Sequence, residues 1–346
     1  MKTFKPLLLV TALATALAVS TTFAAAATPA ASATPDQVTS QFLHALNSGT
    51  GPAINTLPPA QARQVLVGAQ NSVKVDLSGI DVSNRTIEQD GISVPITIVR
   101  PQGVTGTPPV FMFFHGGGWI LGDFPTHERL VRDLVVQSGA VAVFVNYTPS
   151  PEARYPVAIN QAYAATKWVA AHGNEIGVDG SRLAVVGNSV GGNMAAVVSL
   201  MAKDKQGPAI RLQGLMWPVT DNDFNDGSYN AYPEGHFLTR PMMKRFWDAY
   251  TKDPKQRNEI YASPLRASLD QLKGLPPALI QVAQFDVLRD EGEAYGRKLD
   301  AAGDEATTVR YNGTIHDFGL LNALAEDAPT KAAIRQLANE LQSRLK

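Results

Sequence analysis

The stretch that most constrains the fold is residues 183–193, which read LAVVGNSVGGN. Its first four residues are apolar and two of them are β-branched, as is typical of a strand buried on both faces. The apolar run from Met194 to Met201, free of glycine and proline, predicts a buried helix. Between strand and helix, Ser189 has a glycine two residues away on each side, and this spacing permits a sharp turn. We therefore expect the hydroxyl of Ser189 to stand clear of the sheet, beside the free N–H groups of the helix N-terminus.

Strand patterns alternate with helix patterns along most of the chain. Apolar runs predict strands at 110–114, 140–145, 183–186, 212–219, 278–282 and 307–311. Helices are expected at 126–137, 156–172, 194–201 and 291–302, and a hairpin with an Asp-Gly turn at 86–100. This alternation predicts βαβ units, and hence an α/β fold with a mostly parallel central sheet flanked by helices.

Size and charge narrow the class of protein. The chain has 346 residues, of which 45% are hydrophobic and 18% charged, which suits one large α/β domain with insertions. Thirty Lys and Arg residues nearly balance 31 Asp and Glu residues, and no basic run stands out. We therefore expect no nucleic-acid partner.

The first 26 residues have the pattern of a secretory signal peptide. Lys2 and Lys5 precede a short apolar run from Leu7 to Val19, and three alanines at 24–26 offer cleavage sites. The run is too short for a comfortable membrane span, and without any cysteine there is neither a disulfide nor a lipid-modified cysteine. We expect export to the periplasm or the medium, no stable membrane anchor, and a mature α/β domain over residues 27–346.

Two segments do not fit the strand–helix alternation. Residues 36–70 predict two amphipathic helices, the first capped by Asp36 and ended by the glycines near residue 50. Residues 221–255 are rich in Asp, Asn, Gly and aromatic side chains. We interpret both as cap elements over an active-site mouth; for residues 36–70, a plain packing extension is the alternative.

A nucleophilic serine needs a base, and the chain order limits the choice. The serine turn resembles the nucleophile elbow of the α/β-hydrolases, in which the acid and then the histidine follow the serine in sequence. Only His236 and His316 lie downstream of Ser189. His316 follows the last predicted strand in a glycine-containing loop, at the sheet edge where parallel α/β folds build their sites. We predict that His316 is the base.

Three aspartates compete for the role of the acid that orients the histidine. Asp286 directly follows the predicted strand near 278–282. Asp290 lies one turn later and is predicted to cap a helix. Asp221 ends the preceding strand and is the serious competitor. We favour Asp286.

A run of three glycines after the strand at 110–114 predicts an oxyanion hole. The sequence there is HGGGW, from His115 to Trp119. Glycines let backbone N–H groups approach a developing negative oxygen closely. A merely flexible turn is the alternative, but the serine motif and the ordered Asp and His favour the catalytic interpretation.

Together these motifs resemble the hormone-sensitive-lipase group of microbial esterases, a branch of the α/β-hydrolases. The resemblance covers residues 36–346 and rests on HGGGW (115–119), NYTPSPE (146–152), GNSVGG (187–192), DVLRDEG (286–292) and HDF (316–318). It implies an α/β-hydrolase fold with a helical cap, and a carboxylester hydrolase that needs no cofactor. By position, Gly117, Gly118 and Val190 would supply the oxyanion-hole N–H groups.

Three positions depart from the pattern of that group. Asn188 stands where the group usually has Asp, and Val190 where it usually has Ala. Asp317 replaces a frequent glycine and puts a carboxylate beside His316, which is expected to raise the pKa of that histidine. None of the three removes a catalytic group, so they bear on substrate preference.

The predicted function is hydrolysis of short- to medium-chain, small-molecule esters through an acyl-enzyme at Ser189, with His316 as base and Asp286 orienting it. No histidine or cysteine cluster has zinc-ligand spacing, so no metal is expected. A ligand-binding protein of the same fold and an amidase are the alternatives. Core packing competes for at least half of the aromatic side chains that are expected to line the substrate pocket, which are Trp119, Trp217, Tyr229, Phe237, Phe246 and Trp247.

Overall fold

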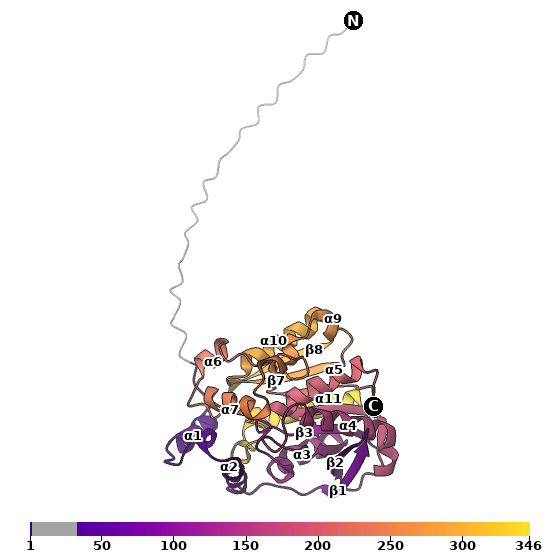
Figure 1. Ribbon diagram of the computed structural model, residues 1–346, viewed down its shortest axis with the longest axis horizontal. Helices are drawn as coiled ribbons and strands as arrows, with labels where there is room; N and C mark the ends of the chain where they lie inside the picture. Colours follow the sequence, from indigo (N-terminus) through magenta and orange to yellow (C-terminus); the bar gives the residue numbers. More distant parts are fainter. Residues whose placement is uncertain (2–32) are drawn as a thin grey trace. The chain divides into compact units, whose positions relative to one another are not determined.

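An eight-stranded sheet organises residues 34–346 in a computed structural model of the chain (Figure 1). The structure describes residues 33–346 and Met1, so the signal peptide predicted at 1–26 lies, apart from Met1, outside the described residues. The strand order is β1-β2-β4-β3-β5-β6-β7-β8. The hairpin strands β1 and β2 run antiparallel to their neighbours, and all other pairs are parallel. This confirms the predicted α/β fold with a mostly parallel sheet.

The strands lie where the apolar runs predicted them. Their bounds are β1 (Ile80–Gln89), β2 (Ile92–Pro101), β3 (Pro109–Phe114), β4 (Val141–Val145), β5 (Asp179–Asn188), β6 (Gln213–Met216), β7 (Ala278–Phe285) and β8 (Ala306–Ile315). β4 is buried along its whole length, as expected of a central strand covered on both faces. β6 ends earlier than predicted because Trp217 has a φ of 38°, which is outside the extended region, and a proline follows it.

Helices cover both faces of the sheet. On one face, α4 (Val157–His172), α5 (Val190–Asp204) and α10 (Arg289–Ala302) share a hydrophobic cluster. On the other, α3 (Phe124–Ser138) packs against α11 (Ala328–Arg344) in a second cluster. α11 is the last helix of the chain and was not predicted from the sequence. It buries Ile334, Leu337 and Leu341.

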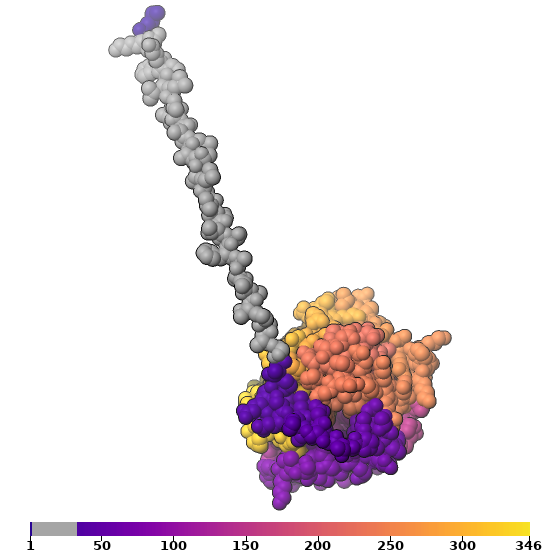
Figure 2. Space-filling view, turned by 90° about the vertical axis from the view of Figure 1, so that its left-hand side faces the viewer, coloured from indigo at the N-terminus to yellow at the C-terminus, as the bar shows by residue number. Residues whose placement is uncertain are grey.

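The segments predicted as cap elements are mostly helical. Residues 36–70 contain α1 (Gln37–Asn47), η1 (Ile54–Thr56) and most of α2 (Pro59–Asn71), and the side chain of Asp36 caps α1 by accepting the N–H of Thr39. Residues 221–255 contain α6 (Gly227–Ala231), α7 (Arg240–Tyr250) and the start of α8 (Pro254–Arg257). The two segments lie side by side on one face, where α7 contacts η1 (Figure 2).

The remaining short elements connect these layers. They are η2 (Gly173–Ile176), η3 (Pro264–Arg266), α9 (Leu269–Leu272) and η4 (Asn322–Leu324). Within the described part of the chain, none of the helices has both the length and the apolar character that a membrane span requires.

Candidate active site

Ser189 lies on the sharp turn between β5 and α5, as the sequence predicts. Its backbone has φ 56° and ψ −122°, which is strained for a residue with a side chain. The flanking glycines are sterically required. A Cβ on Gly187 would lie 2.2 Å from the carbonyl oxygen of Gly191, and one on Gly191 would lie 1.9 Å from that of Phe114. The turn is therefore packed against the end of β3, which fixes the position of the hydroxyl.

His316 and Asp286 are brought to this hydroxyl by the ends of β8 and β7. The Nε2 atom of His316 lies 3.0 Å from the Oγ atom of Ser189. Its Nδ1 atom lies 2.7 Å from Oδ2 of Asp286, whose other oxygen accepts the N–H of Leu288. All three side chains are buried. The structure thus brings together the three residues that the sequence analysis selected.

The other candidates for the acid and the base contact different side chains. Asp221 pairs with Arg266 at 2.6 Å, and Asp290 pairs with Arg289 at 2.7 Å. The ring of His236 stacks on Phe285. Neither aspartate bonds to His316 in the structure, so only Asp286 is in place to orient the imidazole.

Two carboxylates determine the protonation of His316. Burial by itself lowers its pKa, because it penalises the imidazolium. Asp286 and Asp317 act in the opposite direction, and together they raise the pKa of His316 above its usual value. The Oδ2 atom of Asp317 lies 3.8 Å from Nε2, on the side of the ring that faces Ser189. The carboxylate of Asp317 therefore lies beside the imidazole of His316, as the sequence predicts.

The glycine run after β3 forms a backbone loop beside Ser189. Gly117 and Gly118 have φ values of 102° and 63°. A Cβ on Gly117 would meet the carbonyl oxygen of Leu121 at 2.4 Å, and one on Gly118 would meet the ring of Phe246 at 2.2 Å. Both glycines line the same cavity as Ser189 and His316. Val190, the third predicted donor, is the first residue of α5.

A cavity of about 370 Å³ opens onto Ser189 and His316. Most of its wall is apolar and comes from the two segments predicted as cap elements. The apolar lining side chains include Phe42, Leu46, Val65, Leu66, Leu238, Met242 and Phe246. Apart from Phe246, these residues were not proposed as pocket residues from the sequence. The apolar stripes of the two N-terminal helices could have indicated them, because the apolar face of an amphipathic helix packs against another apolar surface.

The predicted pocket aromatics require a correction. Phe237 lines the cavity, but the fully buried rings that do not line it are Trp119, Trp217, Tyr229 and Trp247. The ring of Trp119 stacks on Tyr250 at 3.9 Å instead. Composition alone could not separate these cases, because a buried aromatic ring serves equally well in a core and in a pocket wall.

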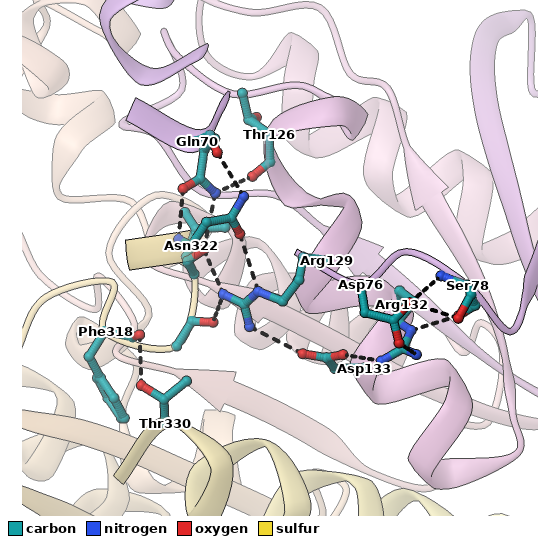
Figure 3. A network of polar contacts seen from close by, with 12 residues as sticks. Gln70, Asp76, Ser78, Thr126, Arg129, Arg132, Asp133, Phe318, Asn322 and Thr330 are labelled. Carbon is teal, nitrogen blue, oxygen red and sulfur yellow. Dashed lines mark hydrogen bonds and ion pairs between the residues drawn. The ribbon is translucent and has the colours of Figure 1, made fainter. Parts of the chain in front are cut away.

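The loop that follows His316 is held by side chains from distant parts of the chain (Figure 3). Arg129 on α3 donates from Nη2 to the carbonyl oxygens of Gly319 and Leu320, at 2.7 and 2.8 Å. Gln70 on α2 donates to Leu320 O at 3.0 Å and accepts the N–H of Asn322 at 2.9 Å. Arg129 and Gln70 are both buried, so these bonds lie away from solvent. Helices α2 and α3 therefore fix the His316 loop.

This geometry supports nucleophilic chemistry. A serine hydroxyl bonded to a histidine that is itself held by a carboxylate can lose its proton as it attacks a carbonyl carbon. Backbone N–H groups at a glycine loop and a helix N-terminus can stabilise the oxyanion that forms. Among the described residues, no group of three or more His, Cys, Asp or Glu side chains is placed to hold a metal ion.

Known proteins are similar to this chain over most of its length. A family model described as alpha/beta hydrolase fold matches residues 111–320. A crystal structure of a thermostable esterase from Pseudomonas putida is 65% identical, covers 90% of this chain and 98% of its own, and superposes with a TM-score of 0.90. A carboxylic ester hydrolase of Mycobacterium tuberculosis is 37% identical over 272 residues, 77% of this chain and 71% of its own length. An ethyl acetate hydrolase of Pseudomonas putida is 32% identical over 245 residues, 69% of this chain and 76% of its own length.

Proposed function

The chain belongs to the α/β-hydrolase family, and on that premise we propose that it is a carboxylesterase acting on small-molecule esters through an acyl-enzyme at Ser189. The observation that carries the proposal is the bonded series Ser189–His316–Asp286, which opens onto an apolar cavity. The esterase names of the relatives support the reaction class.

In the first half of the reaction, the Oγ atom of Ser189 attacks the ester carbonyl while His316 Nε2 takes its proton. The imidazolium is stabilised by Asp286, which also holds the Nδ1–H tautomer. The carbonyl oxygen becomes an oxyanion, for which the N–H groups of Gly117, Gly118 and Val190 are the proposed donors. His316 then gives the proton to the leaving alkoxide, and the alcohol departs.

In the second half, water attacks the acyl-enzyme. His316 takes a proton from the water, and the oxyanion forms again beside the same N–H groups. Collapse of this intermediate breaks the bond to Ser189 Oγ, which recovers its proton from His316. One ester and one water thus give one acid and one alcohol, and the enzyme is regenerated.

The test is Ser189→Ala assayed with p-nitrophenyl butyrate. Removing the nucleophile of another serine hydrolase costs about 10⁶-fold in kcat, so we expect activity to fall to the background of a mock purification. Circular dichroism must report an intact fold. A well-folded Ser189→Ala protein that retains more than a few per cent of the wild-type rate would contradict the serine mechanism.

Short acyl chains are the proposed preference, because the space beside the oxyanion loop is filled. The ring of Phe246 occupies the position that a Gly118 side chain would need, and the rings of Trp119 and Trp247 are fully buried in the same hydrophobic cluster. An acyl group bound next to Gly118 would therefore meet the ring of Phe246, which is backed by these buried aromatic side chains.

A series of p-nitrophenyl esters from acetate to palmitate tests the acyl preference. We expect kcat/KM to fall steeply beyond butyrate or hexanoate, and Phe246→Ala to shift the optimum to longer chains. Phe42→Ala, on the wall formed by α1, is the matched control and should leave the optimum in place. Comparable turnover of butyrate and palmitate would rule out the short-chain preference, and faster turnover of the matching p-nitroanilides would favour an amidase.

Export remains part of the proposal and rests on the sequence of residues 1–26 alone. The mature protein would then be a single hydrolase domain from about residue 27, carrying the segments 36–70 and 221–255 as its cap. Cell fractionation with N-terminal sequencing of the mature protein tests this. An uncut N-terminus in a cytoplasmic fraction would contradict it.

A further inference from the structure

We propose that Asp317 makes the active-site cavity selective for esters whose alcohol part is neutral or positively charged, and that it disfavours esters with an anionic alcohol part. The inference rests on the proposed esterase function and goes further by naming the charge class of the substrate. It assigns a specificity role to a residue that takes no part in the bond-making steps.

The cavity wall carries a single acidic side chain. Among the described residues that line the cavity, Asp317 is the only Asp or Glu, and there is no Lys or Arg. The polar lining side chains apart from Ser189, His316 and Asp317 are neutral, namely Asn47, Asn55 and Thr239. Asp286 lies behind the ring of His316 and does not line the cavity, so Asp317 is the carboxylate that a bound substrate meets directly, between apolar walls that focus its field.

Neutral donors hold this carboxylate in place. Its Oδ1 atom accepts from the indole Nε1–H of Trp217 at 2.7 Å and from the Nδ2–H of Asn188 at 3.0 Å. Within the described residues, its only ion-pair partner is His316, at 3.8 Å. Asn188 in turn accepts the N–H of Gly116 through Oδ1, at 2.9 Å. The charge is thus fixed in space, and no cationic Lys or Arg side chain neutralises it.

The position of Asp317 points to the alcohol part of the ester. His316 Nε2 must lie within hydrogen-bond reach of the leaving oxygen in order to protonate it. The same nitrogen is 3.8 Å from Oδ2 of Asp317. The acyl part, in contrast, is expected beside Gly117 and Gly118, whose N–H groups are the proposed oxyanion donors. Asp317 therefore acts on the alcohol side of the scissile bond.

The asparagine at 188 fits this arrangement. A second carboxylate at that position would face Oδ1 of Asp317 at the 3.0 Å now bridged by an amide N–H. Two ionised carboxylates at that separation repel each other strongly. Asn188 instead donates to Asp317 and accepts from the glycine loop, so one neutral side chain joins the two parts of the site. Asn188 and Asp317, which both depart from the family pattern, thus contact each other.

A charge on the substrate about 6 Å from this carboxylate should change kcat/KM roughly 10- to 100-fold, given an effective dielectric constant of about 20 and some screening. An attractive charge raises the value and a repulsive one lowers it. Three acetate esters of matched length provide the probe: acetylcholine (cationic), 3,3-dimethylbutyl acetate (its neutral isostere) and 3-acetoxypropanoate (anionic).

For the wild-type protein we expect kcat/KM to rank cationic above neutral and neutral above anionic, with about tenfold or more at each step. In Asp317→Asn the kcat/KM of the anionic ester should rise at least tenfold relative to that of the neutral ester. Asparagine keeps the acceptor for Trp217 and Asn188, and it tolerates the φ of 58° at this position. The change in His316 basicity affects all three esters alike, so the ratio isolates the charge effect.

Asp300→Asn is the matched control, because it changes the net charge equally on the exposed face of α10. It should leave the three ratios unchanged. Equal kcat/KM values for the three esters in the wild type, or unchanged ratios in a folded Asp317→Asn protein, would overturn the inference. If that variant fails to fold, the wild-type ranking decides. Failure to hydrolyse even the neutral ester would instead contradict the proposed esterase function.

Discussion

The Ser189 turn and the His316 loop meet at one hydrogen bond, yet they are held in different ways. At Ser189 the constraint is local. Gly187 and Gly191 leave no room for side chains, and the turn continues directly into α5. At His316 the constraint is remote, since the bonds of Gln70 and Arg129 to Leu320 span 250 and 191 positions in the chain.

This difference predicts different consequences of mutation. A side chain added where backbone atoms already fill the space forces the whole turn to shift, and this shift lowers the free energy of unfolding. A loop held by side-chain hydrogen bonds loses them one at a time, with a cost of about 1–3 kcal/mol for each buried group left unpaired. We therefore expect the turn to respond to mutation mainly through folding, and the loop mainly through the placement of the histidine.

Apart from removal of the nucleophile itself, the largest effect on rate is expected where the histidine is oriented. Asp286→Asn keeps the volume but removes the charge and favours the wrong tautomer of His316. The equivalent change in a serine protease lowers kcat about 10⁴-fold, and we expect a loss of roughly two to four decades here. The measurement is kcat on p-nitrophenyl butyrate with the fold checked by circular dichroism.

Asp221→Asn and Asp290→Asn are the controls for that variant. Each removes a carboxylate that pairs with an arginine away from His316. Both should retain kcat within a few-fold of the wild type. If kcat fell strongly in Asp221→Asn and was kept in Asp286→Asn, the acid would be Asp221, which follows the preceding strand.

The second largest effect is expected at the Ser189 turn. In Gly191→Ala the new methyl group would lie 1.9 Å from the carbonyl oxygen of Phe114, so backbone must shift. We expect a loss of about 3 kcal/mol or more in the free energy of unfolding. Gly68→Ala on α2 has no atom within 4 Å of the new Cβ and should stabilise the helix by roughly 0.5–1 kcal/mol. Urea unfolding of both variants provides the comparison, and equal stabilities would refute the steric account.

A smaller effect is expected when the His316 loop is loosened. Gln70→Ala leaves the carbonyl oxygen of Leu320 and the N–H of Asn322 without this partner, at a cost of about 1–3 kcal/mol in unfolding free energy. Because the histidine is displaced, kcat should fall several-fold while KM changes little. Gln61→Ala, exposed on the same helix, is the control. A lower stability with unchanged kcat would mean that Gln70 does not position the histidine.

The smallest effect is a shift in pH dependence. His316 must be neutral to accept the proton of Ser189, so kcat/KM should fall as the pH drops through its raised pKa. Asp317→Asn removes one of the two charges that raise this pKa, and the acidic limb should move to lower pH. The pH profile of kcat/KM on the neutral ester measures this. A limb that stays in place or moves to higher pH would contradict the electrostatic role of Asp317.

Most of the fold and the three bonded residues could be predicted because their signals are local. A strand end followed by a glycine, a serine and a helix start forms one continuous stretch, and so does a strand followed by three glycines. The chain order of Ser189, Asp286 and His316 then selects among the candidates. Parallel strands bring all of these loops to one sheet edge.

The cavity wall could not be predicted in the same way. Trp119, Trp217 and Tyr229 were expected in the pocket and are buried in the core, whereas Phe42 and Leu66 from the N-terminal helices line it. Whether an aromatic ring lines the cavity or lies in the core depends on how separate segments pack, and no single stretch of sequence contains that information.

The sequence by itself determined the order of strands and helices along the chain, the strained turn at Ser189 and the three side chains that are candidates for the reaction, because backbone sterics and hydrophobic periodicity act over a few residues. Only the tertiary structure decided which side chains surround those groups. The contact between Asn188 and Asp317, across 129 positions, and the support of the His316 loop by Gln70 exist because the sheet and the helices fold residues distant in sequence into one buried site. Electrostatic and hydrogen-bond energies depend on distance in space, and the fold sets that distance.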